Sequence, residues 1–155
     1  MTTHKVSATR RVAARPQVVY GIIADYTDGH RLILPKVFQE LEVEQGGVGA
    51  GTVVRFGMRI LGKMRYTRGQ VEEPSPGRLL TERYFDTGTV TSFLVEPAAG
   101  GSQSDVTIAT ELELPGGLFV GLQRWFATRF LRRVYVEELG LLDTVARRRL
   151  AANQG

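Results

Sequence analysis

The spacing of apolar residues changes along the chain, and these changes predict where the secondary structure lies. In residues 5–13 apolar and polar side chains alternate, as in a strand with one buried face. Pro16 then opens a short segment, ending near Asp25, whose apolar residues recur at helical spacing. Residues 31–34 predict one more helical turn, which Pro35 ends. The chain therefore begins with a strand and two short helices.

The middle of the chain returns to strand spacing and is broken by short turns rich in glycine and proline. The glycine run at residues 46–51 and the segment Pro74-Ser75-Pro76-Gly77 are two of these turns. The six predicted strands are residues 37–45, 52–60, 63–72, 78–86, 89–96 and 105–114. Tight turns join antiparallel neighbours, and no helix alternates with these strands, so we expect an antiparallel meander and not a parallel sheet.

The last part of the chain predicts one long helix, from Pro115 to about Ala152, with apolar residues at spacings of three and four. One broad arc of this helix, taken as the face that packs on the sheet, contains Phe119, Leu122, Phe126, Phe130, Val134, Leu141 and Val145. Neither a helix nor a sheet can bury its apolar side alone. We therefore expect an α+β fold, in which a curved antiparallel sheet of about seven strands wraps around the C-terminal helix. A hollow between such layers is a usual small-molecule site.

The order of these segments resembles the helix-grip superfamily called SRPBCC, which includes START lipid-transfer domains, birch-pollen allergens and bacterial polyketide cyclase/dehydrase proteins. The segments that carry the resemblance are residues 11–20, with Ala14-Arg15-Pro16-Gln17-Val18-Val19-Tyr20 similar to the family's "A-x-P-x-x-V-[WY]", then 23–26, 34–37, 96–102 and the final helix. The resemblance implies one START-like helix-grip domain over residues 1–155, with two short helices after the first strand.

This resemblance does not select one activity, because a fold hosts many functions. Members of the superfamily bind lipids, sterols, polyketides, quinones or plant hormones, and some close aromatic rings. The region from Asp25-Tyr26 to Leu34-Pro35 is also similar to the quinone-binding branch. That branch has tryptophan and cysteine after the proline, where this chain has Lys36-Val37.

Composition and charge narrow the possible partners. The net charge is +4, but the basic residues are spread along the chain, and the run Arg147-Arg148-Arg149 suits the end of a helix. We therefore expect no nucleic-acid partner. No apolar run approaches the ~20 residues of a membrane span, and the N-terminus has no signal-peptide core, so we expect no stable membrane insertion and a cytoplasmic location. Without cysteine, and with only His4 and His30, we expect no metal site and no cofactor.

Several side chains are expected to face the hollow. Strand alternation puts Phe56 with Met58, and Phe93 with Val95, on one face, while Tyr84 brings a hydroxyl that needs a partner when buried. The candidate ligand-binding residues are Phe56, Met58, Met64, Tyr66, Arg68, Tyr84 and Phe93 on the strands and Phe126, Phe130, Val134 and Glu137 on the helix. Apolar members of this set would also fill a closed core, and a shift of one residue would turn a strand's set outward.

Glu137 interrupts the apolar arc of the long helix. A buried carboxylate needs a partner, which Arg10, Arg68 or Tyr84 can supply from the sheet. Glu137 and Arg10 are accordingly weak candidates for acid-base catalysis, and a structural ion pair or a side chain at the cavity mouth is the alternative interpretation.

The sequence thus predicts a protein that binds or transports a hydrophobic small molecule, such as a lipid, a quinone or a polyketide-like compound, and it favours a binding role over an enzymatic one. A cyclase, aromatase or dehydratase acting in the same cavity is the first alternative, and a protein-interaction module is the second. Further apolar helix residues lie outside the main arc, among them Trp125 and Val136. These leave open a homodimer contact or a surface beside the cavity mouth.

Overall fold

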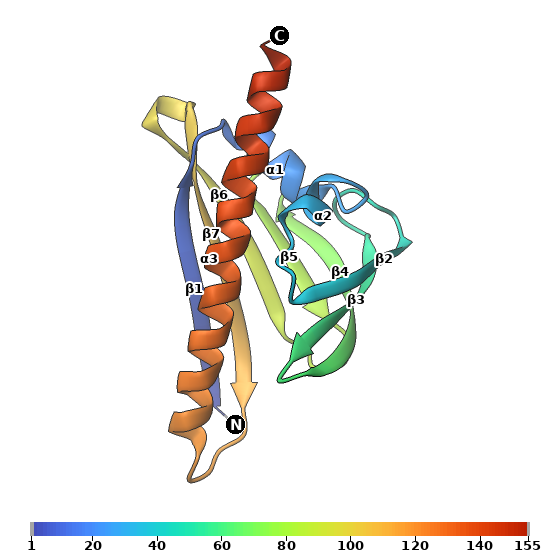
Figure 1. The fold of residues 1–155 in the computed structure, drawn as a ribbon, viewed down its shortest axis with the longest axis vertical. Coiled ribbons are helices and arrows are strands. Elements are labelled where there is room, and N and C mark those ends of the chain that lie inside the picture. Colours follow the sequence, from blue (N-terminus) through green and yellow to red (C-terminus); the bar gives the residue numbers. More distant parts are fainter. Residues whose placement is uncertain (1, 155) are drawn as a thin grey trace.

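The computed structural model describes residues 2–154, and in it a curved sheet holds one long helix against its concave face (Figure 1). The strands are β1 (Thr2–Val12), β2 (Phe38–Gln45), β3 (Val53–Ile60), β4 (Lys63–Ser75), β5 (Leu79–Tyr84), β6 (Val90–Ala98) and β7 (Gln103–Leu114). The helices are α1 (Pro16–Ala24), α2 (Gly29–Ile33), the 3-10 turn η1 (Ala99–Gly101) and α3 (Val120–Asn153). The predicted α+β helix-grip fold is confirmed.

All seven strands form one antiparallel sheet in the order β1-β7-β6-β5-β4-β3-β2. The predicted meander is therefore correct from β2 to β7. β1 pairs with β7 along its whole length, from Thr2 opposite Leu114 to Val12 opposite Ser104. The first and last strands thus become neighbours, and α1 and α2 cross to the far edge of the sheet (Figure 1).

Two glycines, Gly62 in the β3–β4 turn and Gly69 in β4, determine where neighbouring side chains lie. The β3–β4 hairpin turns at Leu61-Gly62, both with positive φ, which Gly62 adopts without strain. This two-residue turn sets Ile60 opposite Lys63 and Met58 opposite Arg65. Further along β4, a Cβ at Gly69 would lie 2.8 Å from the ring of Tyr84. Only glycine therefore leaves room for the Tyr84 ring on the concave face.

α3 begins at Val120 and not at Pro115, because Pro115-Gly116-Gly117 forms an extended lead into the helix. Its C-terminal half packs on β1, α1 and α2, where Val134, Leu139 and Leu142 are buried. Its N-terminal half is mostly exposed, although Thr128 is hydrogen-bonded to His4 on β1 at 2.7 Å. The expectation that Phe126 forms part of the core wall is wrong, since its side chain is 44% exposed.

One carboxylate ties α3 to the first strand. Asp143 accepts a hydrogen bond from the backbone N–H of Ala13 (3.0 Å) and one from Arg147 (3.1 Å), and its Oδ2 lies 3.4 Å from the Arg10 guanidinium. These contacts lower the pKa of Asp143, although burial opposes them. No helix within the described range is long and apolar enough to cross a membrane.

The two halves of α3 should differ sharply in their contribution to stability. Leu139→Ala should lower the free energy of unfolding by about 2–5 kcal/mol, because Leu139 is 1% exposed and its removal leaves a cavity. Leu122→Ala, the same change at a side chain that is 63% exposed, should alter it by less than ~0.5 kcal/mol. Urea unfolding followed by circular dichroism measures both, and equal losses would contradict the placement of α3.

Candidate functional site

A cavity of about 330 Å³ lies between the sheet, α3 and the segment from Tyr26 to Leu41. Most of its wall is apolar. The apolar lining residues are Leu34, Phe38, Leu41, Val54, Phe56, Met58, Ile60, Phe93, Leu112 and Leu131. The rings of Phe38, Phe56 and Tyr84 meet edge to face along this wall, with centroids 5.5 and 5.8 Å apart. The cavity is thus shaped by rings and branched side chains that form a preformed apolar surface.

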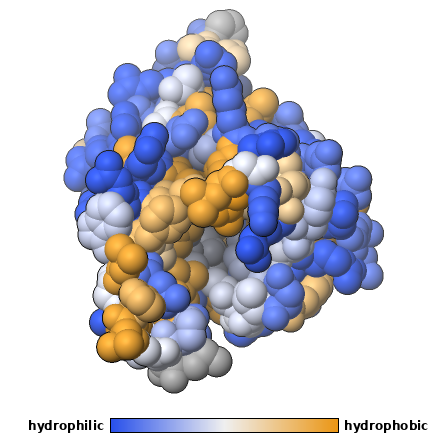
Figure 2. Space-filling model, turned by 60° about the horizontal axis from the view of Figure 1, so that its bottom comes forward, coloured by the Kyte–Doolittle hydropathy of each residue, from blue (hydrophilic) through white to orange (hydrophobic). Residues whose placement is uncertain are grey.

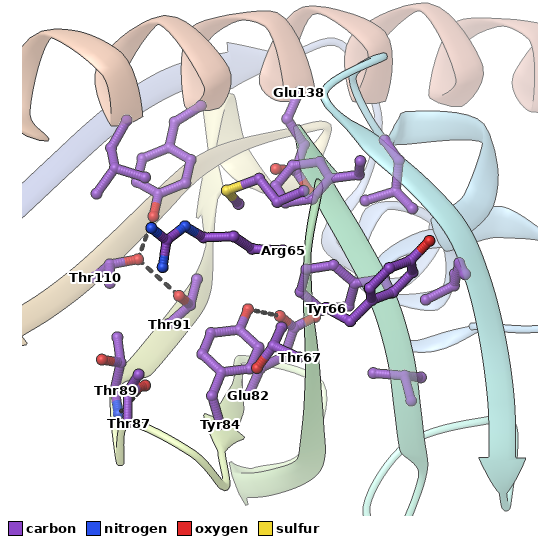
Figure 3. A pocket seen from close by; sticks show the side chains of 18 of the residues that line it. Arg65, Tyr66, Thr67, Glu82, Tyr84, Thr87, Thr89, Thr91, Thr110 and Glu138 are labelled. Atoms are coloured by element: carbon purple, nitrogen blue, oxygen red, sulfur yellow. Dashed lines mark hydrogen bonds between the residues drawn. The ribbon is translucent and has the colours of Figure 1, made fainter. Parts of the chain in front are cut away.

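Polar side chains border the cavity at the ends of β4, β5 and β6. Arg65 and Thr67 project from β4, and Thr87 and Thr89 come from the β5–β6 turn (Figure 3). Thr67 donates a hydrogen bond to Asp86 at 2.9 Å. Because Arg65, Asp86 and Thr87 are exposed, this border is open to water and forms the cavity mouth.

A buried carboxylate, Glu82 on β5, forms the centre of a polar cluster inside the cavity. Its side chain is only 6% exposed. One carboxylate oxygen accepts a hydrogen bond from the Tyr84 hydroxyl at 2.6 Å, and the other accepts one from the Tyr26 hydroxyl. The His30 Nε2 atom lies 3.6 Å from the same oxygen as Tyr26. The two hydroxyl donors offset the cost of burying a carboxylate.

His30 is held in one tautomer beside this carboxylate. Its Nδ1 lies 2.7 Å from the carbonyl oxygen of Ile23 and donates to it, and its ring stacks on Tyr26 at 4.1 Å. Burial lowers the pKa of His30, and Glu82 opposes this shift. The Nε2–Glu82 distance alone would suit an ion pair, but burial is the larger effect. His30 is therefore neutral at pH 7, with its proton on Nδ1.

The two tyrosines that contact Glu82 keep their protons. Burial, followed by the charge of Glu82, raises the pKa of both Tyr26 and Tyr84 well above the ordinary value. Both hydroxyls are therefore hydrogen-bond donors to the carboxylate at any physiological pH.

A second carboxyl group, Glu138 on α3, faces the cavity from the opposite wall (Figure 3). Its side chain is 3% exposed, and within the described part of the chain it makes no hydrogen bond. Burial, followed by the charge of Glu82, raises the pKa of Glu138 well above its ordinary value. Glu138 therefore keeps its proton to a higher pH than an ordinary glutamate, and its protonated form has an O–H donor without a partner among the described residues.

A chain of hydroxyls continues the polar surface. Thr91 and Thr110 are hydrogen-bonded at 2.7 Å, and Thr110 is hydrogen-bonded to the hydroxyl of Tyr135 on α3 (Figure 3). Burial raises the pKa of Tyr135 to about 12. The cavity therefore combines two buried carboxyl groups, only one of which has hydrogen-bond donors, and several hydroxyls, and these groups can bind a ligand's carbonyl or hydroxyl and can move a proton. Within residues 2–154, no three or more histidine or acidic side chains are arranged to hold a metal ion.

Five of the residues expected from the sequence line the cavity: Phe56, Met58, Tyr66, Tyr84 and Phe93. Val134 is buried and Phe130 is partly buried, but both pack in the hydrophobic core and do not line the cavity. Phe126 belongs neither to the hydrophobic core nor to the cavity lining.

The predicted phase of β4 is wrong by one residue. The pairing of Phe56 with Thr67 places Thr67 and Arg65 on the concave face, so Met64, Tyr66 and Arg68 belong to the outer face. Arg68 pairs with Glu44 at 2.6 Å on that outer face. Tyr66 borders the cavity, but its ring lies under the Arg55 guanidinium and its hydroxyl donates to Glu40 at 2.7 Å.

Glu137 and Arg10, the two candidates for acid-base catalysis, do not lie in the cavity as predicted. Glu137 is exposed, and the next residue, Glu138, occupies the interior position. The error is a rotation of the helix by about 100°, caused by counting Phe119, Leu122 and Phe126 as inward-facing. Arg10 is half-exposed, contacts Asp143 on α3 and does not line the cavity.

Sequence reasoning missed the residues of the polar cluster: Tyr26, His30, Glu82, Tyr135 and Glu138. One signal was present for Glu82, which lies between Leu80 and Tyr84 on the alternating face of β5. An acidic residue on the buried face of a strand indicates a partnered carboxylate.

The seven-stranded sheet gripping α3, with this cavity between them, defines the START-like helix-grip class of proteins. The chain belongs to the polyketide cyclase / dehydrase and lipid transport family, whose sequence profile matches residues 3–147. No curated protein matches the sequence at a significant level.

Solved structures agree with this fold. The chain is similar to the KanY protein, with 26% identity, a TM-score of 0.82 and coverage of 95% of this chain and 99% of KanY. It is also similar to the Zhui aromatase/cyclase from Streptomyces sp. R1128, at 16% identity, a TM-score of 0.79 and 99% coverage of both chains. A START superfamily protein from Mycobacterium smegmatis matches at 17% identity and a TM-score of 0.67, covering 94% of this chain and 98% of its own.

The raised pKa of Glu138 predicts a particular pH dependence of stability. In the unfolded chain Glu138 ionises near its ordinary pKa of 4.5, whereas in the folded protein it keeps its proton to a higher pH. Its contribution to the free energy of unfolding is therefore full below the unfolded pKa and is lost as pH rises from there to the folded pKa, at up to about 1.4 kcal/mol per pH unit. Relative to Glu138→Gln, the unmodified protein should lose stability over this range.

Urea unfolding at several pH values between 5 and 8 measures the difference in the free energy of unfolding between the unmodified protein and Glu138→Gln. Because His30 and the other titrating groups are present in both proteins, their contributions cancel in this difference. Glu137→Gln, the exposed neighbour, is the matched control and should give a curve parallel to that of the unmodified protein. A Glu138→Gln curve that is also parallel would show that Glu138 is ionised in the folded state.

Proposed function

We propose that this protein binds a mostly apolar small molecule that carries a carbonyl or hydroxyl group, and that it does so in the cavity between α3 and the sheet. The observation that carries the proposal is the division of the cavity into an apolar, ring-lined wall and a buried polar cluster around Glu82 and Glu138. A volume of about 330 Å³ lies in the range of small-molecule sites. Membership of the family supports the same class of ligand.

The two ends of the ligand follow from the two parts of the cavity. Rings of Phe56, Tyr84 and Phe93 offer edges and faces to a flat, cyclic compound. Glu138 donates one hydrogen bond from its protonated carboxyl, and the Thr91–Thr110 pair can donate or accept. A ligand without a polar group would leave the Glu138 donor without a partner, so an oxygenated ring compound fits better than a plain hydrocarbon.

Two probes that differ only by a hydroxyl group test whether the cavity has an apolar wall and a separate polar cluster. 2-Naphthol should bind the purified protein more tightly than naphthalene by about tenfold, because its hydroxyl can pair with the polar cluster, at about 1.4 kcal/mol per hydrogen bond to a polar site. Met58→Trp should abolish binding of both probes by filling the cavity. Arg59→Trp places the same ring on the outer face of β3 and should leave binding unchanged.

Fluorescence titration of each probe measures these affinities. Equal affinity for the two probes would contradict the role of the polar cluster. Binding that survives Met58→Trp would place the ligand outside this cavity.

A second candidate function is acid-base catalysis, and it is favoured by the pairing of Glu82, which accepts two tyrosine hydroxyls, with Glu138, whose pKa is raised. Dehydration of a β-hydroxy ketone needs both groups. Glu82 removes the proton next to the carbonyl, Glu138 protonates the departing hydroxyl, and water leaves as the double bond forms. Cyclase and dehydratase reactions on polyketide-like compounds include steps of this kind.

A simple substrate tests this candidate. The protein should convert 4-hydroxy-4-phenylbutan-2-one to the conjugated enone and water faster than buffer alone, and the ultraviolet absorbance of the enone follows the reaction. Glu138→Gln should lower the rate by about 10²-fold or more, because glutamine cannot donate a proton to the leaving group. Glu137→Gln should retain the full rate. Absence of turnover above the buffer rate, with 2-naphthol still bound, would leave binding as the function.

A further inference from the structure

The N-terminal part of α3 and the residues just before it expose an unusual number of large apolar side chains. Leu118 is 98% exposed and Trp125 is 58% exposed. We use the name outer face of α3 for the exposed apolar residues Leu118, Phe119, Leu122, Trp125 and Phe126. Figure 2, which brings the lower end of Figure 1 forward, shows apolar side chains gathered there beside a hollow. A contiguous exposed patch of this kind marks an interaction surface.

Arginines continue the outer face along the same side of the helix. At about 100° per residue, Arg129, Arg132 and Arg133 point in the same direction as Leu122 and Trp125. The Arg129 guanidinium lies 5.6 Å from the centroid of the Trp125 ring. No aspartate or glutamate occurs in residues 115–136. The surface is therefore apolar and positively charged, and the first acidic side chain is the exposed Glu137, one helical turn beyond Arg133 at its far edge.

This charge pattern argues against a second copy of the chain as the partner. In a two-fold symmetric dimer the same patch meets itself, so the arginines of both copies would gather at one apolar contact to which residues 115–136 bring no carboxylate. The partner must instead supply an apolar layer and a negative charge side by side. A bilayer containing anionic lipids has this composition, with acyl chains for leucine, phenylalanine and tryptophan and phosphates for the arginines.

We propose that the outer face of α3 docks on the surface of an anionic lipid membrane, without spanning it. The cavity mouth lies at the same end of the molecule, since the β3–β4 and β5–β6 turns and the β7–α3 connection all lie at the lower end of Figure 1. Docking therefore brings the mouth next to the lipid headgroups. The proposal rests on the surface of α3 and is independent of what the cavity binds.

Trp125 is the only tryptophan in the chain, so its fluorescence reports directly on this surface. Vesicles containing about one third phosphatidylserine in phosphatidylcholine should shift its emission to shorter wavelength and protect it from acrylamide. Vesicles of phosphatidylcholine alone should do neither, because the arginines then lack anionic partners. Flotation of the same mixtures measures binding independently of fluorescence.

Two double variants separate the apolar and the charged contributions. Leu122→Gln with Phe126→Gln should abolish binding, and both sites are exposed, so the fold should be retained. Arg132→Gln with Arg133→Gln should weaken binding by about thirty-fold, from a contribution of about fivefold per arginine. Arg15→Gln with Arg148→Gln removes the same charge from exposed positions elsewhere and should have a small effect.

Each outcome decides the proposal. Binding to anionic vesicles alone, lost in the two α3 variants and kept in the control, supports it. No binding to either vesicle, equal binding to both, or an equal loss in all charge variants overturns it. A blue-shifted Trp125 in the absence of lipid, together with a dimer mass that Leu122→Gln with Phe126→Gln converts to a monomer, would assign the surface to a second copy instead.

Discussion

The buried carboxylate of Glu82 is the interaction on which the inside of this molecule depends. It lies on β5 in the middle of the sheet, and it is reached by Tyr26 from the connection between α1 and α2 and by His30 from α2. Without the hydroxyl donors of Tyr26 and Tyr84 a carboxylate in this position would cost several kcal/mol. The same contacts fix the short helices over one end of the sheet. Folding and the polar part of the cavity therefore share one set of hydrogen bonds.

The charge of Glu82 also affects the protonation of the groups around it. Burial, followed by this charge, raises the pKa values of Tyr26, Tyr84 and Glu138 well above their ordinary values. The two glutamates differ in their surroundings, because Glu82 has two hydrogen-bond donors and Glu138 has none among the described residues. This difference is the basis of the proposal that the cavity binds an oxygenated ligand, on a fold that relatives share at low sequence identity.

The two halves of α3 lie in different environments. Its C-terminal half, with Leu139 and Leu142, closes the core, and Asp143 ties it to β1 through the Ala13 backbone. Its N-terminal half presents Trp125 and Phe126 to solvent together with three arginines. One apolar periodicity runs through both halves. Periodicity alone cannot distinguish a face covered by a sheet from a face left open for a partner.

The sequence by itself determined the elements and their order, because turns at glycine and proline and the periods of 2 and 3.6 are local properties of the chain. It also placed Phe56, Met58, Tyr84 and Phe93 correctly on the concave face. The tertiary structure decided the rest. The turn at Leu61-Gly62 sets the register that turns Arg68 outward and Arg65 inward, and the rotation of α3 exposes Glu137 and buries Glu138. The cluster around Glu82 joins residues more than fifty positions apart, and such contacts arise only when the sheet and helices pack together.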